Sequence, residues 1–191
     1  MSTIYKEATD RAFDPSRQAA VWPTALKWGA IAGTVGSVLT LLVYNLGYMD
    51  IGEDGELPSS TGSFLVSAIV YAGLIYTGMK AYRDGDNGGL MTFGRGMLWS
   101  LGFGIALGVV TAIFTLLLYT VLAPDYLAEL SEATLDQMAA DGMDEASLEA
   151  TEVMIGYTTS TPFIVLSTLL VALILPLLLG LVVSGILRKE P

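Results

Sequence analysis

The 191-residue sequence contains no cysteine and no histidine. Without them the chain has no thiolate nucleophile, no histidine proton shuttle, no Ser-His-Asp triad and none of the usual zinc or haem ligands. Charged residues are also few, at 15% against about a quarter in ordinary soluble domains. We therefore expect no catalytic residue, no cofactor and no bound metal. The formal net charge of −10 also disfavours nucleic acid as a partner.

Long apolar segments make up much of the chain, and 53% of its residues are hydrophobic. At about 1.5 Å per helical residue, four of these segments are long enough to cross a hydrocarbon layer of about 30 Å. We expect transmembrane helices at about 26–48, 63–82, 97–123 and 162–187. The predicted fold class is an all-α membrane protein, with residues 1–191 as one domain.

Lysine and arginine are distributed unevenly, and this predicts the orientation of the spans. All nine lie before or at the start of the first span, around the connection between the second and third, or after the fourth. Positively charged loops remain in the cytoplasm. We expect a multi-pass protein of the bacterial cytoplasmic (inner) membrane, with a cytoplasmic N-terminal segment over 1–24 and both termini in the cytoplasm.

The four spans form two hairpins in this topology, and the first and third spans share residues. Seven of the sixteen positions from Gly29 to Tyr44 are identical to those 75 residues later. Because these spans run in the same direction, a duplicated hairpin would be a parallel repeat. The alternative is that Gly, Leu and Thr recur by chance in a sequence of low complexity.

The connection between the third and fourth spans, residues 124–161, is predicted to be an extra-cytoplasmic acidic helical loop. Apolar residues recur at helical spacing after Pro124, and again from Asp144 to about Ile155, with Gly142 as a break. This pattern predicts two amphipathic helices outside the membrane. They are either a solvated cap on the ends of the spans or a docking surface for a basic partner.

Glycines spaced four apart inside two spans predict close helix contacts. They are Gly29 and Gly33 in the first span and Gly104 and Gly108 in the third. Packing within the chain is favoured over dimerisation, because its own spans are the nearest partners. The third span is expected at the centre of the bundle. Pro176, in the middle of the fourth span, is expected to kink that helix.

Residues 84–89, Asp-Gly-Asp-Asn-Gly-Gly, begin like a calcium-binding EF-hand loop. That loop needs an oxygen ligand at its fifth position and a glutamate at its twelfth, where this chain has Gly88 and Arg95. A glycine-rich turn between two helices explains the same residues, because glycine tolerates positive φ.

The connection between the second and third spans resembles the domain-of-unknown-function 4199 family, which comprises small four-helix membrane proteins of Bacteroidota and relatives. The family pattern G-x-K-x-Y-R-D, N-G and S-F-G-K-G is matched here by Gly78, Lys80, Tyr82, Arg83, Asp84, Asn87, Gly88 and Thr92-Phe93-Gly94-Arg95-Gly96. The resemblance covers nearly the whole chain. It implies the fold and a membrane location, but lends no activity.

Five residues of this connection are expected to contact lipid headgroups or to close the hairpin. They are Lys80, Arg83, Asp84, Phe93 and Arg95. The basic side chains lie within reach of lipid phosphates, and Phe93 is suited to anchoring at the membrane interface. The alternative use of these residues is a site for a protein partner.

The resulting hypothesis is a non-enzymatic integral membrane protein, either free-standing or a structural or accessory subunit of a membrane assembly. Its expected partners are membrane lipids and other membrane subunits. One alternative is a small transporter or channel for a neutral solute, prompted by the repeat and by Pro176. A second is a membrane enzyme that uses outer-loop carboxylates such as Asp125, Glu129 and Glu132.

Overall fold

The computed structural model describes residues 20–47 and 60–189. In these ranges the chain forms helices, joined by short turns, and one isolated antiparallel bridge between Met91 and Lys189. The predicted all-α class is confirmed. Most of the expected N-terminal segment, and the acidic residues that follow the first span at 50–56, lie outside the described residues.

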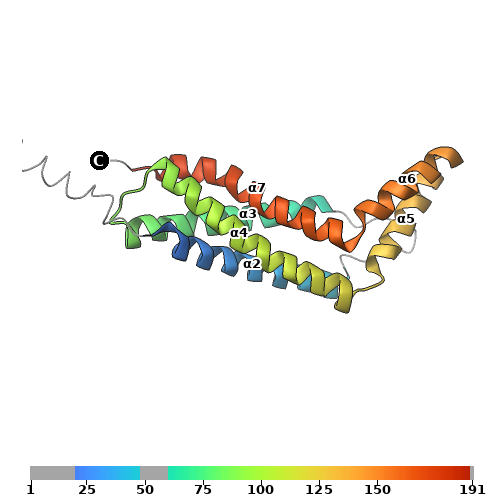
Figure 1. The fold of residues 1–191 in the computed structure, drawn as a ribbon, viewed down its shortest axis with the longest axis horizontal. Helices are drawn as coiled ribbons and strands as arrows, with labels where there is room; N and C mark the ends of the chain where they lie inside the picture. Colours follow the sequence, from blue (N-terminus) through green and yellow to red (C-terminus); the bar gives the residue numbers. More distant parts are fainter. Residues whose placement is uncertain (1–19, 48–59, 190–191) are drawn as a thin grey trace, which may run out of the picture. The chain divides into compact units, whose positions relative to one another are not determined.

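Within residues 20–47 and 60–189, four helices are long and apolar enough to cross a membrane, as the sequence predicts (Figure 1). They are α2 (Val21–Asn45), α3 (Ser60–Ala81), α4 (Phe93–Leu117) and α7 (Thr161–Leu187). The chain is therefore a multi-pass membrane protein. The pairing of these helices into duplicated hairpins stays a prediction.

All four long helices begin before the apolar segments that predicted them, α2 and α4 by the largest margins. The helix α2 begins at Val21, ahead of residue 26, and carries Pro23 in its first turn, where the missing N–H costs no hydrogen bond. The helix α4 begins at Phe93, ahead of residue 97, because the Thr92 hydroxyl accepts a hydrogen bond from the amide of Arg95 at 3.4 Å. Helix bounds thus follow capping, whereas the prediction followed apolarity.

The helices α3 and α4 each continue into a short π-helical stretch. These are η2 (Tyr82–Asp86) and η3 (Leu118–Leu122). Each ends with an amide that donates to a carbonyl five residues back, from Asn87 to Tyr82 at 3.0 Å and from Ala123 to Leu118 at 2.7 Å. Single π-helical turns often occur at functional sites. Here each one leads directly into a candidate site.

The chain divides into two compact units. Unit 1 contains residues 1–32, 69–107 and 173–191, and unit 2 contains 33–68 and 108–172. All nine lysines and arginines belong to unit 1 by sequence, and unit 2 has none. The division by contacts therefore coincides with a division by charge.

Within unit 1, α4 contacts each of the other three long helices. Trp99 and Phe103 of α4 are fully buried, and their ring centroids are 5.4 Å apart. A Cβ added at Gly78 of α3 would lie 2.7 Å from the Trp99 ring, and one added at Gly29 of α2 would overlap the carbonyl oxygen of Phe103. These side chains and close backbone approaches form the core of unit 1.

The helices α4 and α7 meet through a reciprocal pair of small residues. Gly96 on α4 lies against the side chain of Ser184, and Gly180 on α7 lies against the side chain of Ser100. Both serines are fully buried, and Ser100 donates to the carbonyl of Gly96 at 3.1 Å. The helix α7 continues through the buried Pro176, and the expected kink there stays a prediction.

Within unit 2, the segment after η3 forms two helices that pack side by side (Figure 1). They are α5 (Tyr126–Ala140) and α6 (Glu145–Thr158). Gly142 adopts a φ of 89° between them, and Asp144 caps α6 by accepting from the amide of Ser147 at 3.0 Å. Leu127 and Ile155 are buried. Two helices thus stand where the spacing predicts them, and their location outside the membrane stays a prediction.

Candidate functional site

The turn between α3 and α4 is held to the C-terminal end of α7. Arg83 pairs with the neighbouring Asp84, with Nε 2.6 Å from Oδ1, and its Nη1 donates to the carbonyl of Leu187 at 3.3 Å. Met91 and Lys189 exchange two backbone hydrogen bonds of 3.1 and 3.0 Å. Residues more than 90 positions apart in sequence are therefore joined at one end of unit 1.

A second set of hydrogen bonds joins the same turn to α2 and to the start of α4. Arg95 donates from Nη1 to the hydroxyl of the buried Tyr82 at 2.7 Å. Thr24 of α2 donates to Oδ2 of Asp86 at 2.6 Å. Asp86 was not among the residues predicted for this site, because its partner on α2 lies 62 positions away.

The five residues predicted for this turn therefore fall into two groups. Arg95 bonds to Tyr82 across the turn, whereas Arg83 bonds to the neighbouring Asp84 and to the carbonyl of Leu187 on α7. Lys80 and Phe93 are exposed, and their contact with lipid headgroups stays a prediction. In the described part of the chain, no group of three or more acidic side chains is arranged to hold a metal ion.

The glycines predicted for helix packing occupy positions of different tightness. Gly29 makes the close approach to Phe103 described above, whereas a Cβ at Gly108 would lie 3.4 Å from Ala172, an ordinary contact. Gly33 and Gly104 are buried. Gly78, Gly96 and Gly180 make tight contacts that the sequence interpretation missed. Gly96 and Gly180 are each followed four residues later by a serine, a pair of small residues on one helix face that could have indicated these contacts.

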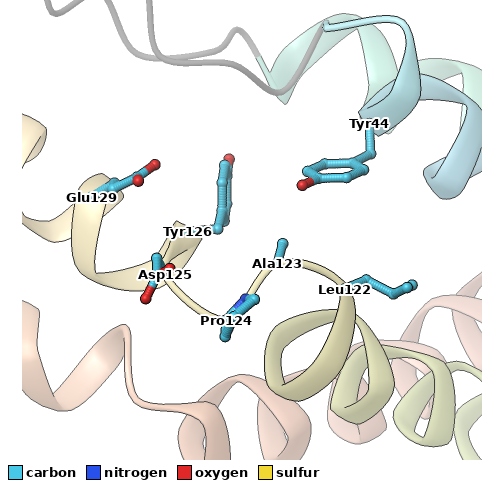
Figure 2. A pocket seen from close by; sticks show the side chains of 7 residues that line it. All are labelled: Tyr44, Leu122, Ala123, Pro124, Asp125, Tyr126 and Glu129. Atoms are coloured by element: carbon cyan, nitrogen blue, oxygen red, sulfur yellow. The ribbon is translucent and has the colours of Figure 1, made fainter.

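A cavity of about 410 Å³ opens in unit 2, where α2 ends and α5 begins (Figure 2). Its lining comprises Tyr44, Leu122, Ala123, Pro124, Asp125, Tyr126 and Glu129. Ala123 leaves the helical conformation, and Pro124 cannot donate to a preceding turn, so the chain changes direction here. The helix α5 then begins with the amide of Glu129 bonded to the carbonyl of Asp125 at 3.0 Å.

Aromatic rings form two sides of this cavity. Figure 2 shows Tyr126 between Tyr44 on one side and Glu129, one turn further along α5, on the other. The ring of Tyr119 stacks on that of Tyr126, with centroids 6.0 Å apart and planes 16° apart. Tyr126 is thus packed against a second ring behind the cavity wall. The sequence similarity between the first and third spans aligns Tyr44 with Tyr119. This alignment was the signal in the sequence that pointed to these rings.

The cavity lies in a strongly acidic part of the molecule. The residues of unit 2 include thirteen acids and no lysine, arginine or histidine. Asp125 and Glu129, two of the three carboxylates predicted for the membrane-enzyme alternative, both line the opening. Unit 2 therefore supplies no cation of its own to neutralise them.

The helix α6 has a second apolar face besides the one that packs on α5. Leu148 and Ile155 lie on the packed face, as the spacing predicts. The other face, here called the α6 stripe, comprises Ala146, Ala150, Val153, Met154 and Tyr157, all of them exposed. The exposed fractions of Val153, Met154 and Tyr157 are 75%, 63% and 68%. This stripe was not predicted, although its residues have helical spacing.

Comparisons with known proteins bear on the family only. No curated protein and no solved structure matches the chain. A family model described as a protein of unknown function, DUF4199, matches residues 27–189. This range includes the α3–α4 turn and all four long helices except the first residues of α2. The resemblance seen in the sequence is confirmed, and the chain belongs to the DUF4199 family.

Proposed function

We propose that this protein is a non-enzymatic accessory subunit of the bacterial cytoplasmic membrane, which binds another membrane protein through the α6 stripe. The observation that carries the proposal is the exposure of Val153, Met154 and Tyr157 on one face of a helix. Contiguous apolar surface on a polar segment marks an interaction site. The stripe lies away from the less exposed face of α6, on which Ile155 is buried and Leu148 borders a groove with Leu135 and Ala139 of α5.

The charges beside the stripe define the chemistry of the partner. At 100° per residue, Glu145, Glu149 and Glu152 follow one edge of the stripe along α6. All three carboxylates are exposed, and unit 2 contains no basic residue. Complementary charges guide and orient protein association. The partner is therefore a membrane protein that presents lysine or arginine beside an apolar surface.

The proposed orientation places both termini in the cytoplasm and α5 and α6 on the opposite side. It is supported by the charge division, since every lysine and arginine belongs to unit 1. In this orientation the exposed Lys80 and Phe93 contact anionic headgroups and the interface of the inner leaflet. Because the chain has no cysteine, single cysteines at positions 80 and 137 can report each side with a membrane-impermeant maleimide.

Transport of a neutral solute receives less support from the hydrogen bonds inside the spans. Thr40, Thr77 and Ser167 donate to carbonyls of their own helices at 3.0, 2.8 and 2.9 Å. Hydroxyls used in this way contribute little to a polar pathway. The proposal therefore assigns the spans to anchoring and the α6 stripe to binding.

The test is co-purification of the full chain from its native membrane in mild detergent. We expect a second membrane protein at constant stoichiometry, lost when Val153 and Met154 are both replaced by asparagine. The matched control is Ala140→Asn, at an exposed position on α5 outside the stripe, which should retain the partner. A protein that runs alone at every detergent concentration, or a partner that survives the double substitution, would contradict the proposal.

A further inference from the structure

We infer that the cavity between Tyr44 and Tyr126 binds an organic ammonium group, of the kind carried by ethanolamine and choline. This site is separate from the α6 stripe and does not depend on it. The inference rests on three properties of the cavity: its aromatic walls, its carboxylates, and its position at the ends of two membrane-spanning segments.

The aromatic walls favour a large and weakly hydrated cation. The face of an aromatic ring attracts a cation placed within about 6 Å of its centroid, and tyrosine-lined sites recognise quaternary ammonium groups in this way. Tyr44 and Tyr126 border the same opening from different helices (Figure 2). The stacked ring of Tyr119 limits rotation of Tyr126 and keeps that wall in place.

The carboxylates supply the opposite charge. Glu129 lies one helical turn after Tyr126, and both line the cavity with Asp125. Unit 2 contains no lysine, arginine or histidine, so no side chain of that unit can neutralise these acids. A bound ammonium group would supply the missing positive charge. An N–H group of ethanolamine can also donate a hydrogen bond to the carboxylate of Glu129.

The same residues fit a metal ion less well. Calcium takes six to eight oxygen ligands and magnesium a near-ideal octahedron, as both are hard cations. In the described part of the chain no three acidic side chains converge in a way that would hold a metal. Rings on two sides of the opening, with two carboxylates on its border, match an organic cation better than either metal.

The size and position of the cavity limit the sources from which the ligand could come. A volume of about 410 Å³ lies within the range of small-molecule sites, roughly 300–1,000 Å³. The spanning segments that contribute to it end at Asn45 and Leu122, so the opening lies where the membrane meets water. An ammonium group reaches this level either as a phospholipid headgroup or as a free amine in solution.

The experiment measures binding to the full chain in lipid nanodiscs made only of phosphatidylglycerol. Radiolabelled choline and ethanolamine probe the free amine, and equal nanodiscs with added phosphatidylethanolamine probe the headgroup. Saturable binding of the free amine that the added lipid does not reduce assigns the site to a soluble ligand. Competition by the added lipid assigns it to the headgroup. Absence of both saturable amine binding and lipid adducts in native mass spectrometry would overturn the inference.

Substitutions separate this site from non-specific adsorption. Tyr126→Leu should weaken binding by about tenfold, because a cation–π contact is lost, whereas Tyr126→Phe keeps the ring and should stay within about twofold. Glu129→Gln keeps the side-chain volume and should weaken binding by a comparable factor. The controls Tyr76→Leu and Glu132→Gln alter an aromatic residue and a carboxylate outside the cavity. Equal binding by Glu129→Gln and its control would contradict the inference even if Tyr126→Leu failed to fold.

Discussion

The side chain of Ser100 on α4 lies against Gly180 on α7 so closely that a β-carbon at position 180 would overlap it. Gly96 and Ser184 repeat this contact one turn away with the roles of the helices exchanged. Small residues that allow close approach are the usual means of packing helices in a membrane, where lipid is as apolar as a leucine side chain. Within unit 1, this contact joins α4, the helix that follows the α3–α4 turn, to the C-terminal helix α7.

Replacing Gly180 by alanine should therefore destabilise unit 1. The added methyl group overlaps Ser100, and overpacking of this kind costs about 1–3 kcal/mol. Thermal unfolding in detergent, followed by circular dichroism, measures the effect. The matched control is Gly185→Ala on the same helix, where a Cβ meets nothing within 4 Å. Equal melting temperatures for the two variants would show that the α4–α7 contact is looser than described.

Gly29→Ala should cost more than Gly180→Ala. At position 29 the added Cβ would meet the backbone carbonyl of Phe103, which cannot rotate away as a serine hydroxyl can. The helices α2 and α4 must then separate, and the buried Phe103 loses packing. A comparison of the two melting temperatures under identical detergent conditions checks this order. The reverse order would contradict the position assigned to α2 in unit 1.

Arg83→Gln should release the C-terminal end of α7 without unfolding the protein. The guanidinium group joins Asp84 to the carbonyl of Leu187, and its loss leaves the backbone pair of Met91 and Lys189 with less support. Hydrogen exchange of the amides of residues 91 and 189 should become faster. Lys80→Gln removes an exposed charge nearby and should leave both exchange rates unchanged. Unchanged rates in Arg83→Gln would show that the bridge, not the arginine, holds this end.

The cap of α6 should depend on pH through Asp144. Hydrogen bonds from the hydroxyl and then the amide of Ser147 hold the pKa of Asp144 below its usual value. Because the pKa is lowered in the folded state, the ionised cap stabilises α6 fully at pH values above the ordinary pKa of an aspartate. This stabilisation is lost as the pH falls through the lowered pKa. Asp144→Ala should therefore speed exchange of the Ser147 amide at neutral pH, and the difference from wild type should shrink in acid. A pH-independent difference would contradict the cap.

Much of the architecture was predictable, because membrane spans are encoded by local length and apolarity. The four long helices, the family, and the positions of α5 and α6 all follow from patterns within a single segment. The tight contacts at Gly78 and Gly180 did not follow, since each depends on a residue of another helix. The cavity was missed for the same reason: Tyr44 and Tyr126 lie far apart in sequence and meet only where α2 ends and α5 begins.

The α6 stripe was missed for a different reason. Its residues have the spacing of a helical face, but α6 has two such faces, and the one containing Leu148 and Ile155 accounts for its packing on α5. From sequence, such a segment looks like one amphipathic helix with some apolar residues on its polar side. Only the structure separates the buried face from the exposed one.

Photo-crosslinking in intact cells tests most directly whether the α6 stripe binds another membrane protein. A photoreactive amino acid in place of Met154 should yield one adduct of discrete mass that contains a second membrane protein. The same amino acid in place of Gln137, exposed on α5 outside the stripe, should yield none. Adducts from Met154 to lipid alone, or no adduct from either position, would contradict the account.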